Sequence, residues 1–176
     1  MLVLDFAQSG KQNIQTFKIN EGDLHHEIHS GYCDGKSGAA SIVPHVWYFH
    51  LNILGIDFMD EITKFKLFGA TLMANAKARW LTVYERALHS SAHGDEISFD
   101  FAVRDFIAKY CDESSRDTQL QYVRRVCKPR RSQMSVHDFQ MYLENCNQVA
   151  DWMPSTSPIF TDDALKRVFV QAMPDT

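Results

Sequence analysis

The stretch from Asp60 to Met153 constrains the fold most, because its large apolar residues recur at helical spacing. Residues that are three, four, seven and eight positions apart share one face of a helix. The stripes are Ile62, Phe65, Phe68, Leu72 and Ala76; Trp80, Val83, Tyr84, Ala87 and Leu88; Phe99, Ala102, Val103, Phe106, Ile107 and Tyr110; Leu120, Val123, Val126 and Cys127; and Val136, Phe139, Leu143, Cys146 and Ala150. We therefore predict a bundle of amphipathic helices, an all-α fold.

Short polar residues mark the starts of two of these helices. Ser98 precedes the third stripe and Ser135 precedes the fifth. A serine side chain at this position accepts a hydrogen bond from the first turn of the helix. Asp138 lies three residues after Ser135, which predicts an imperfect capping box.

The N-terminal part of the chain has a different pattern. Leu2–Ala7 and Ile14–Ile19 contain residues that favour β-strands, and 8–13 is rich in turn-forming residues. We expect a short β-hairpin from these two segments. The polar, glycine-rich stretch 20–40 is predicted to be a loop.

The apolar segment Ile42–Phe58 is ambiguous. Pro44 suits the first turn of a helix, and Gly55 would end that helix. A buried strand is the alternative, since periodicity does not separate the two over so short a run.

Two helical lobes are expected, because the hydrophilic stretch 111–117 follows a strongly apolar helix. The second lobe is predicted to contain helices near 116–127, 135–151 and 161–173. Asp162 and Asp163 would lie in the first turn of the last helix and complement its dipole. The predicted organisation is a hairpin and loop over 1–40, one lobe over 41–111 and another over 112–176.

The composition supports packed lobes. Of the 176 residues, 45% are hydrophobic, which is enough for a core. The net charge of −4 argues against a chain whose main task is to neutralise the phosphates of nucleic acid. No apolar run approaches the roughly 18 residues of a membrane helix, and no secretory signal opens the chain. We therefore expect a cytoplasmic protein that makes no contact with a membrane.

A metal site could be built from His25, His26, His29 and Cys33, three of which are spaced four apart. Gly22 and Gly31 make a helix there unfavourable, so we prefer a polar loop. We predict no metal and no other cofactor.

No catalytic site is predicted. Cys111, Cys127 and Cys146 lie on or beside apolar stripes, where burial makes a thiol unreactive. The carboxylates are spread over polar faces, and the chain has no glycine-rich phosphate loop and no GxSxG or HExxH motif. We expect a protein that is not an enzyme and takes no small-molecule substrate.

A basic group consists of Arg124, Arg125, Lys128, Arg130 and Arg131. Such a cluster could contact the phosphates of RNA. Cations at the end of a helix also complement its dipole, and a proline at 129 would stop that helix. We favour this second interpretation and leave a weak contact to RNA open.

Two stretches together resemble the Gag capsid region of long-terminal-repeat retrotransposons. The first contains Phe68-Gly69-Ala70-Thr71-Leu72, Ala76, Ala78, Trp80, Phe99, Val103, Phe106 and Tyr110. The second contains Lys128-Pro129-Arg130-Arg131, Met134-Ser135-Val136, Asp138-Phe139, Asn147 and Pro154, followed by Leu165, Phe169 and Ala172-Met173-Pro174. The resemblance covers about 60–176 and implies a retroviral-capsid-like pair of helical lobes behind an N-terminal hairpin.

The sequence also departs from this family. It has no Cys-x-x-Cys-x-x-x-x-His-x-x-x-x-Cys knuckle, which usually binds RNA in such proteins, and 20–58 matches no part of the pattern. The resemblance therefore implies that this chain is the lattice-forming piece of a longer polyprotein.

The resemblance implies a structural function: copies of the chain would assemble through rings of five or six into virus-like particles that enclose RNA. Trp152 and Met153, at a helix end beside a proline turn, are candidates for an assembly contact, although they could equally fill the core of their own lobe. The alternatives are a capsid-derived helical adaptor for a protein partner and a helical nucleic-acid-binding protein.

Overall fold

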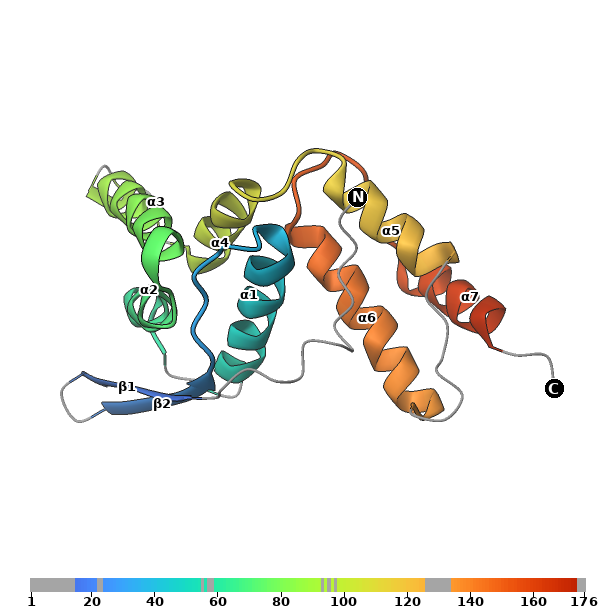
Figure 1. Cartoon of the computed structure of the whole chain (residues 1–176), viewed down its shortest axis with the longest axis horizontal. Coiled ribbons are helices and arrows are strands. Elements are labelled where there is room, and N and C mark those ends of the chain that lie inside the picture. The colour runs from blue at the N-terminus through green and yellow to red at the C-terminus, as the bar shows by residue number, and fades with distance from the viewer. Residues whose placement is uncertain are drawn as a thin grey trace. The chain divides into compact units, whose positions relative to one another are not determined.

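The computed structural model describes residues 15–21, 24–54, 56, 59–92, 94, 96, 98–125 and 134–173. Within these residues the chain is mostly helical and carries one two-stranded antiparallel hairpin, as the sequence predicts (Figure 1). The chain divides into two compact units, one holding the described residues up to Tyr110 and the other those from Cys111 on. The first unit contains β1 (Gln15–Glu21), β2 (Leu24–Ser30), α1 (Ala39–Ile53), α2 (Glu61–Ala70), α3 (Ala74–Ala92) and α4 (Phe99–Ala108), and the second contains α5 (Ser115–Arg125), α6 (Val136–Trp152) and α7 (Asp162–Ala172).

The hairpin uses a pair of segments different from the predicted pair. Strand β1 overlaps the second predicted strand, Ile14–Ile19, and β2 occupies part of the stretch that we expected to be a loop. The other predicted strand, Leu2–Ala7, lies outside the described residues. Strand β2 is amphipathic: His25, Glu27 and His29 are exposed on one face, while Ile28 is buried on the other. Among the side chains of β2 that the structure describes, Ile28 is the one large apolar residue that is buried, and polar residues surround it in the sequence, which is why the segment resembles a loop.

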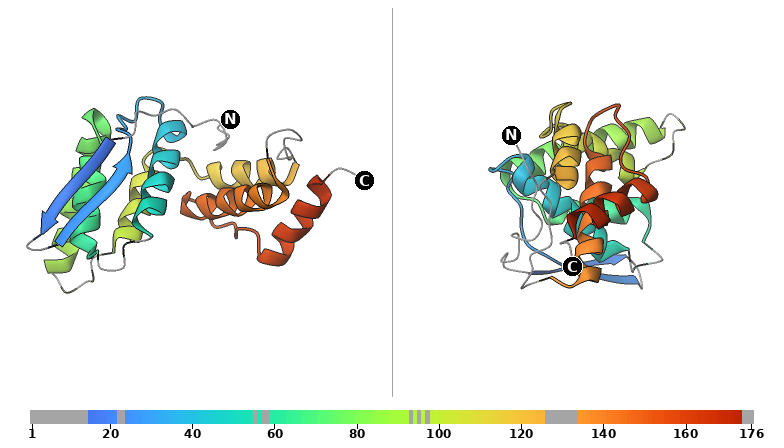
Figure 2. Two further views of the ribbon diagram at one scale, coloured as in Figure 1. Left: turned by 90° about the horizontal axis from the view of Figure 1, so that it is seen from below. Right: turned by 90° about the vertical axis from the view of Figure 1, so that its right-hand side faces the viewer.

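The hairpin lies along one side of the first unit, with β1 beside α2 and β2 beside α1 (Figure 2). Helix α1 resolves the ambiguity of the apolar segment 42–58 in favour of a helix. It begins at Ala39, so Pro44 lies inside the helix and not in its first turn. It ends at Ile53, and Gly55 lies outside the described residues.

An aromatic core joins the helices of the first unit. Its buried members are Phe49, Phe65, Phe68, Trp80, Phe99 and Phe106. The indole of Trp80 packs edge-on against Phe68, with ring centroids 4.7 Å apart, and its Nε1–H donates a hydrogen bond of 3.1 Å to the carbonyl oxygen of Phe65. A side chain at Gly69 would place its Cβ 3.1 Å from the indole, so a glycine keeps α2 close to this ring.

The first predicted stripe is divided between two helices, which corrects our assignment of it to one. Helix α2 ends at Ala70, and Leu72 forms an isolated bridge with Cys33 before α3 begins. The chain reverses at Ala74, which has a φ of +48°, in the left-handed region that non-glycine residues seldom adopt. Ile62 is 40% exposed and not part of the core.

The second unit is built on predicted helix starts. Ser135 and Asp138 form the complete capping box of α6, and Thr161 caps α7. Ser98 likewise caps α4 in the first unit. The core of the second unit lies between its helices and contains Val123, Phe139, Leu143, Cys146, Leu165 and Val168.

Polar side chains fix the loop between α6 and α7. The guanidinium of Arg116, on α5, donates five hydrogen bonds of 2.7–3.1 Å to the carbonyl oxygens of residues 150, 151, 153 and 157. Asn147 pairs with the backbone of Phe160: its Nδ2 donates to the carbonyl oxygen at 2.9 Å, and its Oδ1 accepts from the N–H at 3.0 Å. The Arg116 bonds give donor partners to carbonyls in and after the last turn of α6, and the carbonyl of Ala150 also accepts the N–H of Met153 at 3.2 Å.

Replacing Arg116 with methionine should lower the free energy of unfolding by about 3 kcal/mol, because it leaves several half-buried carbonyls without their charged donor. Arg116→Lys should recover only part of the loss, since an ammonium group cannot reproduce the planar fork. Chemical denaturation followed by circular dichroism measures both. Arg125→Met, at an exposed position on the same helix, is the control. Equal stability of Arg116→Met and the control would contradict this assignment.

His45 is a buried neutral histidine in the first unit. Its side chain is 1% exposed, and its Nε2 lies 2.8 Å from the hydroxyl of Thr71. That hydroxyl donates to the carbonyl oxygen of Phe68, so it accepts from His45 Nε2–H. The Nδ1 atom has no hydrogen-bond partner within the described residues. Burial lowers the pKa of His45 from 6.5 to about 4.

Since the lowered pKa means that the folded state binds fewer protons than the unfolded state, the contribution of His45 to stability is complete above pH 6.5. It is lost as the pH falls toward 4, with a total effect of about 3 kcal/mol. His45→Leu should remove this part of the pH dependence in chemical denaturation between pH 7 and pH 4, whereas His25→Gln, at an exposed position, should leave it unchanged. A His45→Leu profile as steep as that of the unmodified chain would show that other groups govern acid sensitivity.

Candidate functional site

The candidate metal ligands are not brought together. His25 and His29 lie on the exposed face of β2, whereas Cys33 is buried and its backbone pairs with Thr71 and Met73. The side chain of His26 is outside the described part of the chain. Among the described residues, no group of three or more histidines, cysteines or carboxylates could hold a metal ion.

The cysteines that the structure describes are buried, free thiols. Cys33, Cys111 and Cys146 have this state, and Cys127 lies outside the described residues. Burial raises the pKa of Cys33 and raises that of Cys111 to about 11. Both are therefore protonated at neutral pH, which is the unreactive form of a thiol.

Only part of the basic group is described. Arg124 and Arg125 are exposed in the last turn of α5, and Lys128, Arg130 and Arg131 lie outside the described residues. The guanidinium of Arg124 lies over the ring of Phe160, 5.2 Å from its centroid. This contact favours the structural interpretation of Arg124, in which the residue stabilises its own unit.

The two residues proposed for an assembly contact end α6. Trp152 is half-buried, whereas Met153 is 2% exposed. A contact between copies needs an exposed side chain, so the burial of Met153 speaks against this part of the prediction. The backbone of Met153 serves instead as an acceptor for Arg116.

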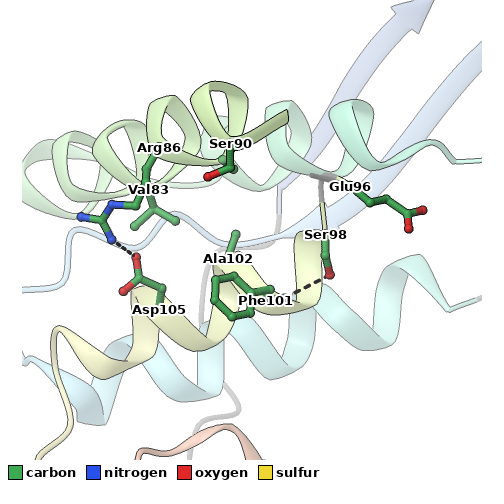
Figure 3. A pocket seen from close by; sticks show the side chains of 9 residues that line it. Val83, Arg86, Ser90, Glu96, Ser98, Phe101, Ala102 and Asp105 are labelled. Atoms are coloured by element: carbon green, nitrogen blue, oxygen red, sulfur yellow. Dashed lines mark hydrogen bonds and ion pairs between the residues drawn. The ribbon is translucent and has the colours of Figure 1, made fainter. Parts of the chain in front are cut away.

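The structure presents a surface groove between α3 and α4 that the sequence did not reveal (Figure 3). We call it the α3–α4 groove; its volume is about 500 Å³. It is lined by Val83, Arg86, Ala87, Ser90, Glu96, Ser98, Phe101, Ala102 and Asp105. Val83 and Ala102 are buried, so its floor is apolar.

Phe101 projects at this groove with 76% of its surface exposed, more than any other large apolar residue that the structure describes. The backbone N–H of Phe101 donates a hydrogen bond of 3.3 Å to the hydroxyl of Ser98, which fixes Phe101 in the first turn of α4. Phe101 lies two positions from Phe99 and therefore cannot share the buried stripe. A phenylalanine off the apolar face was the one signal of this site in the sequence.

A second groove lies between α6 and α7, within the other unit. Its volume is about 790 Å³, and it contains the buried Leu143 and Leu165 and the half-buried Phe169. Val170, also in its lining, is 69% exposed. We call this the α6–α7 groove. Each unit therefore carries a groove of mixed apolar and polar lining, with a strongly exposed apolar side chain at it.

Comparison with known proteins identifies no relative: no protein-family model, curated protein or solved structure matches the chain. In the described part of the chain, no helix combines the length and the apolar character that crossing a membrane requires.

The stacking of Arg124 on Phe160 can be tested directly. Arg124→Ala should lower the free energy of unfolding by about 0.5 kcal/mol, the size of an exposed cation–π contact, and Arg125→Ala should have less effect. Thermal unfolding followed by circular dichroism provides the comparison. If the order of the two variants is reversed, Arg124 does not stabilise the second unit.

Proposed function

We propose that this chain is a structural protein whose copies associate with one another through helix surfaces, as its resemblance to Gag capsid proteins implies. The observation that carries the proposal is the pair of grooves, one in each unit, whose linings include the exposed apolar side chains of Phe101 and Val170. Water contact at such side chains is unfavourable, and burying them against another copy would remove it.

Two contact surfaces in one chain have a consequence that a single surface lacks. A chain with one self-complementary surface stops at a pair. A chain with a second surface on another unit can continue into rings, layers or closed shells. Individually weak contacts then add through multivalency, so neither groove needs to bind tightly by itself.

We assign no chemistry to the buried residues Cys33, Cys111 and His45. Burial keeps the thiols of Cys33 and Cys111 protonated and His45 neutral at physiological pH. The proposed function is therefore non-catalytic.

RNA is the cargo that the resemblance implies. The net charge of −4 opposes strong electrostatic binding, so we propose that RNA is enclosed mainly because the shell forms around it. Resistance of co-purified RNA to nuclease, lost when assembly is blocked, would support this part of the proposal.

Light scattering over a range of protein concentrations tests self-association. The mean mass should rise well above that of one chain, Phe101→Asp and Val170→Asp should each reduce it, and the double variant should reduce it further. Leu81→Asp is the matched control, because Leu81 is 46% exposed on α3 but lines neither groove. A mass equal to one chain at every concentration would contradict the proposal and favour an adaptor that receives a partner's helix in a groove.

A further inference from the structure

We propose that the α3–α4 groove binds a second copy of this chain about a two-fold axis, with Phe101 of each copy inserted into the groove of the other. The inference rests on the proposed self-association and specifies one of its contacts.

The projecting side chain and the cavity that would receive it belong to the same face. Phe101 stands at the wall of the groove, and the floor beside it is formed by Val83 and Ala102. The small side chain of Ala87 leaves room between the helices. A two-fold rotation therefore buries both Phe101 rings and fills both grooves, because each copy supplies one ring and one cavity. Aromatic side chains that fill a partner's pocket are the residues on which such contacts most depend.

The charges at the two ends of the groove are opposite. Figure 3 shows Arg86 and Asp105 at one end, Glu96 at the other, and Phe101 and Ala102 between them. Asp105 forms ion pairs with Arg86 at 2.6 Å and with Lys109 at 3.4 Å. Lys109 does not line the groove itself, but the two cations outnumber the one carboxylate, so this end carries a positive excess. Glu96 forms no ion pair within the described residues, and its end is negative.

A two-fold axis through the middle of the groove places the positive end of each copy against the negative end of the other. Arg86 would then face Glu96 of the second copy, twice per contact. A uniformly charged partner, such as RNA or an acidic peptide, would be attracted at one end and repelled at the other. The charge pattern therefore fits a second copy best, and complementary charges set the register of the pair.

The charge pattern allows an exchange experiment. Arg86→Glu makes both ends of the groove acidic, and Glu96→Arg makes both basic. In a two-fold contact each variant repels its own copies, but a mixture of the two restores two attractive pairs. In the mixture, the carboxylate introduced at position 86 of one copy faces the guanidinium introduced at position 96 of the other, and the unchanged Glu96 of the first copy faces the unchanged Arg86 of the second. Val170→Asp is included in every sample to weaken association through the α6–α7 groove, so that pairing alone is measured.

Sedimentation velocity at a series of concentrations gives the dissociation constant of each sample. The equimolar mixture should associate at least ten-fold more tightly than either variant alone, and added salt should reduce the difference. Circular dichroism checks that each variant is folded. Phe101→Asp, at an exposed position, is the second test and should weaken pairing at least ten-fold, while Leu81→Asp should leave it unchanged.

The failure of this contact can be told apart from the failure of self-association. If the unmodified chain forms large assemblies, but the mixture is no tighter than its components and Phe101→Asp is without effect, this contact is wrong and the proposed function stands. Binding of a helical peptide or RNA to the groove with no pairing of chains would also overturn it. A strictly monomeric unmodified chain overturns both.

Discussion

The first unit depends on the packing of one indole ring. Trp80 lies between α2 and α4, stacked on Phe65 at 5.2 Å between centroids and edge-on to Phe106 at 5.4 Å, and its N–H is satisfied by a backbone carbonyl. A buried indole without that acceptor would be strongly unfavourable. Because Gly69 has no side chain, α2 can approach the ring closely. The position of α3 relative to α2 and α4 follows from this contact.

The α3–α4 groove is a result of the same packing. The aromatic rings fill the interior beneath the two helices, and Val83 and Ala102 close the floor, so the helices meet through small side chains at their outer edge. The groove is formed in the single chain, and a preformed site reduces the entropy lost on binding. In the second unit, Arg116 and Asn147 hold the loop between α6 and α7 through hydrogen bonds to its backbone.

The sequence predicts most of the helices because their stripes and caps agree. Ser98, Ser135 and Thr161 cap helices in the structure, and each precedes a strongly periodic apolar segment. Strand β2 was missed because its sequence is mostly polar, and such a strand is not distinguishable from a polar loop. The break between α2 and α3 was missed because Leu72 and Ala76 continue a helical spacing across a turn, whose left-handed residue is an alanine and not a glycine. The grooves could not be predicted, since a cavity between helices depends on how far apart the helices pack. The position of Phe101 outside the apolar stripe indicates only that an aromatic side chain is exposed.

Electron microscopy of the concentrated chain tests most directly whether copies of it build an ordered assembly. We expect regular rings, layers or closed shells, because a chain with two separate contact surfaces can repeat the same pair of contacts from copy to copy. Isolated single chains, or only irregular aggregates, at concentrations where the protein remains folded would contradict the account.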